Sequence, residues 1–172
     1  MKPVTHILHH VRRQRGYFGI VLYQPKTIEN LGVLIRSCGN FGAAFIATIG
    51  HRYHRSPGDT MNVMKHYPGF HFKTLHDCLL AVPVNADIVR VEVDGATELP
   101  NFIHPERAIY VLGGEDRSVP VIPCARSIKI DSRRCLNLHI AASIVMYDRN
   151  AKEVRYAAAI ADRELDALKA VE

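Results

Sequence analysis

The feature that most constrains the fold is a strand, a helix and a second strand that follow one another early in the chain. Gly19–Tyr23 is short, apolar and β-rich, and it ends at a Gln-Pro pair, which is typical of a strand followed by a turn. From Ile28 the apolar residues recur at helical spacing, with Gly39 and Gly42 ending the element. Phe45–Ile49 is a second apolar run. A β-α-β unit normally places its strands side by side, so the sequence predicts an α/β fold with a parallel sheet.

The remainder of the chain continues this alternation and divides into three parts. We expect a basic N-terminal segment over 1–17, an α/β domain over 18–150 and a peripheral tail or helix over 151–172. Apolar patterns predict strands at 70–72, 88–93, 108–112 and 127–130, and helices at 60–66, 75–82 and 136–149. The last of these helices is apolar almost all round, so we expect its own sheet to cover one side and a partner the other.

Length and composition restrict the classes of protein. The chain has 172 residues, with 48% hydrophobic and 23% charged residues, which fits one domain around a real core. It shows no apolar signal-peptide stretch and no run long enough to span a bilayer, so we expect a cytoplasmic protein without membrane contact. Its four cysteines form no CxxC pair and are expected to be reduced thiols. A net charge of +5 is compatible with a polyanionic partner.

The sequence does not match the common nucleotide-binding templates. The turn after the first strand, residues 24–30, has no glycine, and the chain contains no GxxxxGK[ST] phosphate loop. Its Gly-Gly turn comes late, in residues 112–116 (LGGED). A ligand held there would lie at the carboxyl end of the sheet but in the C-terminal half of the chain.

Three sequence segments are candidate functional motifs because of their order along the chain: 30–36 (NLGVLIR), 112–120 (LGGEDRSVP) and 135–142 (CLNLHIAA). Their order and spacing resemble the three motifs of the SPOUT class of RNA methyltransferases, in the TrmH-like (SpoU) branch that methylates ribose 2′-hydroxyls. The resemblance extends from about Gly19 to Arg149. It implies an α/β domain with a C-terminal trefoil knot, a homodimer, S-adenosylmethionine bound in a bent form, and tRNA or rRNA as substrate.

The resemblance implies four catalytic residues: Arg36, Asn30, Glu115 and Asn137. The family is usually described as using this arginine to deprotonate the ribose hydroxyl, but a guanidinium is almost never an available base. We favour a grip on the neighbouring phosphate and stabilisation of the developing alkoxide. Asn30 would orient Arg36 or the substrate, although an ordinary helix-terminal asparagine fits equally well. Glu115 could hold substrate or fix the neighbouring helix terminus.

The resemblance also implies a cofactor site built from backbone and apolar groups, with no metal. Cys135 stands where many relatives have serine, and Ser118 where the second motif normally ends in glycine. A thiol is a weaker hydrogen-bonding group than a hydroxyl. By correspondence the cofactor contacts fall on Val91, Glu92, Leu112, Gly113, Gly114, Ile130, Cys135 and Leu136.

Two basic clusters are candidate RNA contacts. The first, His51-Arg52-Tyr53-His54-Arg55, combines cations with a ring that could stack on a base. A zinc site on its histidines is a competing interpretation, which the flanking arginines disfavour, and an ordinary polar loop is another. The second cluster includes Arg12 and Arg13, in a segment that could equally be a solvated terminus.

Three further functions stay open at this point. A non-catalytic RNA-binding relative could keep the fold, and a SPOUT enzyme that methylates a base would normally lack the Arg36 arrangement. If the resemblance misleads, the periodicity alone would favour a flavodoxin-like binding domain with an unknotted sheet.

Overall fold

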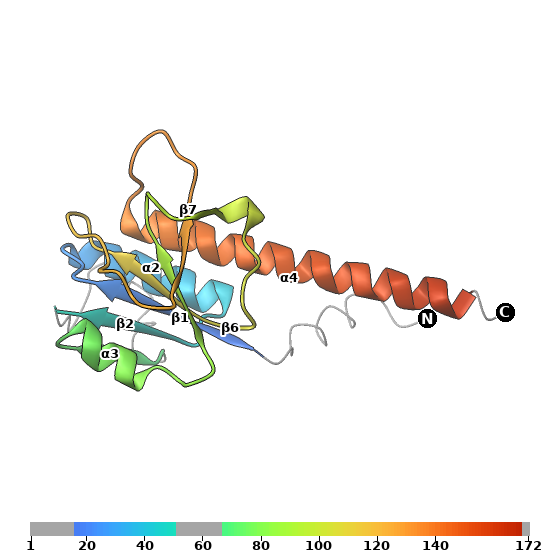
Figure 1. Cartoon of the computed structure of the whole chain (residues 1–172), viewed down its shortest axis with the longest axis horizontal. Helices are drawn as coiled ribbons and strands as arrows, with labels where there is room; N and C mark the ends of the chain where they lie inside the picture. The colour runs from blue at the N-terminus through green and yellow to red at the C-terminus, as the bar shows by residue number, and fades with distance from the viewer. Residues whose placement is uncertain (1–15, 51–66, 170–172) are drawn as a thin grey trace.

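The computed structural model describes residues 16–50 and 67–169, which form a seven-stranded sheet with helices on both faces (Figure 1). The strand order is β3-β2-β1-β6-β4-β7-β5, and each neighbouring pair is parallel. This confirms the predicted α/β fold with a parallel sheet. The strands are β1 (Tyr17–Tyr23), β2 (Phe45–Ile49), β3 (Gly69–Phe72), β4 (Asp87–Val91), β5 (Thr97–Glu98), β6 (Arg107–Gly113) and β7 (Arg126–Lys129).

The helices lie in two layers. Helices α2 (Ile28–Phe41) and α4 (Leu138–Lys169) pack side by side on one face, and α3 (Leu75–Ala81) lies on the other (Figure 1). A 3-10 turn, η2 (Leu99–Asn101), precedes β6. The predicted helix over 60–66 falls outside the described residues. Strand β5 and η2 were not predicted, because two or three residues are too few to show a period.

The centre of the sheet is formed by β1 and β6, which pair from Tyr17 with Arg107 to Tyr23 with Gly113. Their middle residues are buried, and their sequences are nearly continuous apolar runs. Such runs are typical of strands covered on both faces in a parallel sheet. The pairing places the carboxyl ends of β1 and β6 next to each other, at the edge where ligands of open α/β sheets bind.

Helix α2 ends where a left-handed residue is required. Gly42 has φ 76°, a conformation that glycine adopts without steric cost, and the N–H of Ala43 donates to the carbonyl of Cys38 at 3.0 Å. Gly39, also proposed from the sequence as an end of this helix, lies inside it. The chain therefore turns sharply from α2 into β2 at the amino-terminal edge of the sheet.

Helix α4 is one continuous helix of 32 residues, so the predicted helix over 136–149 and the predicted tail belong to the same element. Leu138, Ala142, Val145 and Met146 are buried against the sheet and α2. The opposite side exposes Ile140 and Tyr147. Beyond the sheet the helix extends as a rod away from the rest of the molecule (Figure 1).

A buried polar network fastens the middle of α4 to the segment before β6. Asp148 accepts from the Nε2–H of His104 at 2.9 Å, so the neutral ring accepts from the Tyr110 hydroxyl at Nδ1, 2.6 Å away. Arg149 donates to that hydroxyl and to the carbonyl of Pro105. Burial lowers the pKa of His104, although Asp148 opposes the shift. Burial thus keeps His104 neutral at physiological pH.

Candidate active site

The site begins where β1 and β6 end. The N–H of Gly114 donates to the carbonyl of Tyr23 at 2.8 Å, which extends the pairing of the two strands by one residue. The chain then turns back, with the N–H of Arg117 donating to the carbonyl of Gly114 at 3.1 Å. This turn forms a loop over the carboxyl ends of the central strands.

Both glycines of this loop are required by close backbone contacts. A Cβ on Gly113 would collide with the carbonyl of Arg117, and one on Gly114 would collide with the carbonyl of Gln24. These atoms belong to the backbone and cannot move away as a flexible side chain could. Gly114 thus allows the loop after β6 to pack directly against the loop after β1, and Gly113 allows the loop after β6 to fold back closely on itself.

Strand β4 holds the far end of this loop through two side chains. Glu92, just after β4, accepts the N–H of Val119 at 2.6 Å, and Arg90 donates to the carbonyl of Val119 at 2.7 Å. Val119 is buried, so these bonds satisfy both of its backbone polar groups. Residues 113–119 are consequently fixed at one end by β1 and at the other by β4.

The loop forms one wall of a cavity of about 240 Å³ at this edge of the sheet. Its other walls come from the ends of β4 and β7 and from the first turn of α4, which contributes Leu138 and Ala141. All eight residues that the sequence implied for cofactor binding line it: Val91, Glu92, Leu112, Gly113, Gly114, Ile130, Cys135 and Leu136. Residues that sequence reasoning did not place in the cofactor site also line it: Val93, Glu115, Asp116, Arg117, Ser118, Ser132, Leu138 and Ala141.

The four predicted catalytic residues are not gathered in this cavity. Glu115 lines it, whereas Arg36 and Asn137 are exposed and do not. Arg36 lies about 12 Å along α2 from its first residue, and helical side chains lean back toward the N-terminus, that is toward the site. Asn30 belongs to the first turn of α2, but its side chain is outside the described residues. The six predicted RNA-binding residues, Arg12, Arg13, His51, Arg52, Tyr53 and Arg55, also lie outside them.

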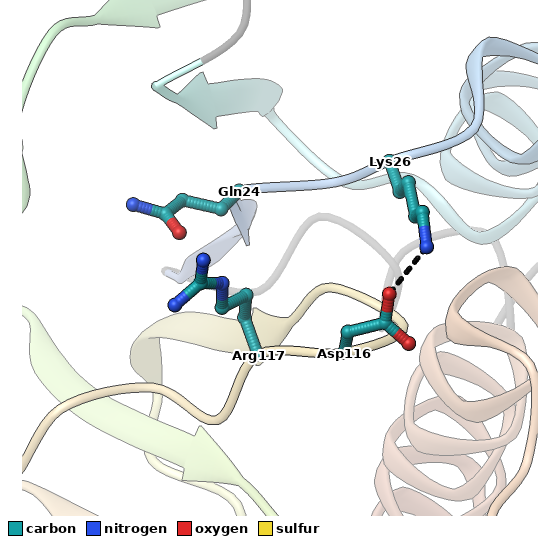
Figure 2. A pocket seen from close by; sticks show the side chains of 4 residues that line it. All are labelled: Gln24, Lys26, Asp116 and Arg117. Carbon is teal, nitrogen blue, oxygen red and sulfur yellow. Dashed lines mark hydrogen bonds and ion pairs between the residues drawn. The ribbon is translucent and has the colours of Figure 1, made fainter.

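A second cavity, of about 370 Å³, adjoins the first and shares Asp116 and Arg117 with it. It lies between the loops after β1 and β6 and is also lined by Gln24 and Lys26 (Figure 2). Lys26 forms an ion pair with Asp116, and its backbone N–H donates to the Glu115 carboxylate at 2.9 Å. Hydrogen bonding and attraction within the pair raise the pKa of Lys26 and lower that of Asp116.

Sequence reasoning missed Gln24, Lys26 and Asp116 as site residues, although a signal was present. Gln24 and Lys26 directly follow a buried strand of a parallel sheet, and the carboxyl ends of such strands form the ligand-binding edge. The same rule already pointed to the Gly-Gly turn after β6. Applied to both central strands, it would have brought these residues together.

The described part of the chain shows neither a metal-binding cluster nor a membrane-spanning helix. Residues 16–50 and 67–169 contain no group of three or more His, Cys, Asp or Glu side chains that could hold a metal ion. In the same residues no helix is both long and apolar enough to cross a membrane.

Comparison with solved structures shows the same fold in several RNA methyltransferases. A structure concerning the 2-OH methylation of C/U34 on tRNA matches 78% of this chain and 95% of its own, with TM-score 0.70 and 23% identity. An AdoMet-bound rRNA methyltransferase from Sinorhizobium meliloti matches with TM-score 0.71 and 20% identity over 81% of this chain and 57% of its own. The SpoU methyltransferase AviRb from Streptomyces viridochromogenes matches with TM-score 0.71 and 17% identity over 86% of this chain and 64% of its own.

Sequence comparison places the chain in a family. No protein of curated function matches it significantly. The model of the SpoU rRNA Methylase family matches residues 17–147, from the first residue of β1 into α4, and so includes both cavities. On this match, over most of its length, the chain belongs to the SpoU rRNA methylase family.

Proposed function

We propose that this protein is a cytoplasmic, S-adenosylmethionine-dependent RNA methyltransferase that modifies ribose 2′-hydroxyls of tRNA or rRNA. One observation carries the proposal: in a member of the SpoU family, the eight residues implied for cofactor binding and the motif glutamate Glu115 line a single cavity. The similarity to a structure concerning 2-OH methylation of tRNA and to an AdoMet-bound rRNA methyltransferase agrees with it.

The residues of the 240 Å³ cavity fit this cofactor. Apolar side chains suit an adenine ring and a methylene chain, and Val91, Leu112, Ile130, Leu136 and Leu138 provide them. The backbone of Gly113 and Gly114 forms part of the same wall. S-adenosylmethionine supplies an electrophilic methyl group on a sulfonium, which requires neither a metal nor a thiol nucleophile.

The protein's own side chains would then act on the RNA. Glu115 is held by the backbone N–H of Lys26, which fixes the carboxylate between the N-terminus of α2 and the cavity. Arg36, two turns further along the same helix, would grip a phosphate with its planar fork and stabilise the developing alkoxide. Asn30 would orient Arg36 or the substrate, and Asn137 would help to shape the site.

The strand order supports the trefoil knot that we propose for the C-terminal part. Val119 and Ile122 pack on the face with α3, β7 then enters the sheet between β4 and β5, and α4 packs on the opposite face. The short connection from β4 to β5 closes tightly over β7. In it, the N–H of Glu92 donates to the carbonyl of Ile128 at 3.0 Å, and a Cβ on Gly95 would collide with the same peptide group. From these contacts we infer that the chain crosses from the α3 face to the α4 face beneath this connection.

We also propose a homodimer formed through the exposed side of α4. Ile140 and Tyr147 lie two turns apart on this helix and are 41% and 64% exposed. Phe41, from the end of α2, contacts the Tyr147 ring with centroids 6.5 Å apart, so the apolar surface spans both helices. A symmetric contact would bury this surface in both copies. Sedimentation of the protein as a monomer at micromolar concentration would contradict the dimer.

The function is tested with cofactor, RNA and metal-free protein. Titration of chelator-treated protein with S-adenosylmethionine should release or absorb heat and raise the melting temperature. Radiolabelled methyl should then appear in unfractionated tRNA or rRNA, but not in a target oligonucleotide that carries 2′-deoxyribose at the acceptor position. Absence of binding would overturn the enzyme assignment, and methylation of the deoxy target would overturn the ribose assignment. Cofactor binding without methyl transfer to any RNA would favour a non-catalytic relative.

A further inference from the structure

The second cavity has no role in the proposed cofactor site. It is lined by Gln24, Lys26, Asp116 and Arg117, which come from the loops after β1 and β6 (Figure 2). Asp116 and Arg117 line both cavities, so the loop that carries them is a shared wall. A group that enters the second cavity therefore lies beside the first one, separated from it by the loop after the Gly-Gly turn.

The side chains of this cavity are arranged on two sides. Arg117 points toward Gln24 on one side, and the Lys26–Asp116 ion pair closes the other (Figure 2). The Lys26 and Asp116 side chains are 67% and 65% exposed. An ion pair that exposed contributes little stability, so it can open when a competing anion arrives.

Gln24 has a strained backbone that fixes it at this site. Its φ of 47° lies in the left-handed region, which costs a residue with a Cβ. The strain is maintained by neighbours on both sides: the Gln24 N–H donates to the carbonyl of Ile49 at 2.9 Å, and its own carbonyl packs against Gly114. The structure thus holds an amide side chain, a donor and an acceptor, at the rim of the cavity.

We propose that this cavity is the entry site for the RNA strand next to the acceptor ribose, with Arg117 binding a phosphodiester. Its planar guanidinium matches two phosphate oxygens at once, and Gln24 would contact the adjoining nucleotide. Lys26 is a second phosphate ligand that Asp116 restrains in the absence of RNA. This inference rests on the proposed function, because it assigns a binding site for the substrate of that reaction.

The loop carries a cation and an anion, and removing one or the other should change RNA affinity in opposite directions. Arg117→Ala removes a cation from the cavity and should weaken binding of unfractionated tRNA about tenfold at low salt. It should also reduce the slope of log affinity against log salt by about 0.7–0.9, the contribution of one phosphate contact. Arg117→Lys keeps the charge but not the fork, so it should restore the slope and only part of the affinity.

Asp116→Asn provides the opposite change. It removes the anion that restrains Lys26 and would repel phosphate, so RNA affinity and its salt dependence should both rise. If the ion pair served only to hold the two loops together, this variant would weaken binding instead, which would overturn the role assigned to Lys26.

The matched control is Arg107→Ala. Arg107 is also an exposed arginine, but it begins β6 at the other edge of the sheet, about 20 Å from Gly113. Its removal changes the net charge by the same amount and should leave tRNA affinity, salt slope and methyl transfer unchanged. Cofactor affinity, measured by calorimetry, should be unchanged in the Arg107 variant.

Failure of this inference is distinguishable from failure of the proposed function. If the wild-type protein transfers methyl to RNA but Arg117→Ala binds tRNA with the same affinity and salt slope as Arg107→Ala, the entry site is wrong and the enzyme stands. If the wild-type protein neither binds nor methylates tRNA or rRNA, the proposed function is wrong, and this inference falls with it.

Discussion

Replacing Glu92 by alanine should lower both the free energy of unfolding and the affinity for S-adenosylmethionine. The carboxylate accepts the N–H of Val119, a residue that is 2% exposed, so the substitution leaves a buried donor without an acceptor. Such a loss costs about 1–3 kcal/mol. Glu92→Gln keeps a carbonyl oxygen in reach and loses only the charge assistance, which amounts to about 1 kcal/mol. Urea unfolding at fixed protein concentration measures both values.

The same bond is expected to position the loop that lines the cofactor cavity. If the loop must be re-ordered on binding, affinity falls by the same free energy, roughly five- to 150-fold for Glu92→Ala. Arg90→Met separates this effect from direct contact, because Arg90 holds the Val119 carbonyl but does not line the cavity. It should also weaken cofactor binding. Glu98→Gln, which disturbs only an exposed ion pair with Lys129, is the control. Wild-type stability and affinity in Glu92→Ala would refute the reasoning.

Three other predictions follow from the site and from the polar network of α4. Arg36→Ala should leave cofactor affinity near normal while methyl transfer falls by orders of magnitude, because only interactions stronger in the transition state accelerate the reaction. Arg36→Lys should restore little of the activity, because a lysine cannot reproduce the planar fork. Near wild-type turnover in the alanine variant would contradict the catalytic assignment of Arg36. Gly114→Ala should abolish cofactor binding in calorimetry, because the added Cβ collides with the Gln24 carbonyl and separates the loops after β1 and β6. Unchanged affinity would show that cofactor binding does not depend on the contact between these loops. Burial lowers the pKa of His104 below its usual 6.5, so the unfolded chain binds the proton first as pH falls. The free energy of unfolding should therefore decrease below about pH 6.5, by at most ~1.4 kcal/mol per pH unit. His104→Gln should flatten this dependence in urea unfolding, and an equal decrease in both proteins would show that other groups cause it.

The elements of the fold were predictable where local periodicity determines them. Helix α2 and strand β2 have the bounds that their apolar spacing indicates. The end of α4 was not predictable in the same way, because the composition changes near residue 150 while no glycine or proline lies between Leu138 and Lys169 to stop the helix. A change of composition marks where a helix leaves the protein's surface, not where its hydrogen bonds end.

The cofactor cavity was predictable only through the family resemblance, which supplied correspondences that no pattern in the chain contains. The contacts that shape it join residues far apart in sequence: Lys26 and Asp116 are 90 positions apart, and Arg90 and Val119 are 29 apart. Neither pair has a helical or strand period. Such pairs become visible only once the sheet order has placed β1 beside β6 and β6 beside β4.

Helix α4 connects the two edges of the sheet, and this determines how the cavity wall is held. Leu138 and Ala141, in its first turn, line the cavity. About 21 Å further along, Lys152 donates to the carbonyls of Leu99 at 2.6 Å and Phe102 at 3.0 Å, beside the His104–Asp148 contact. A helix is rigid along its axis, so fixing it at Asp148 and Lys152 also fixes its first turn. The polar network at the amino-terminal edge thus contributes to the geometry of a cavity that none of its residues touches.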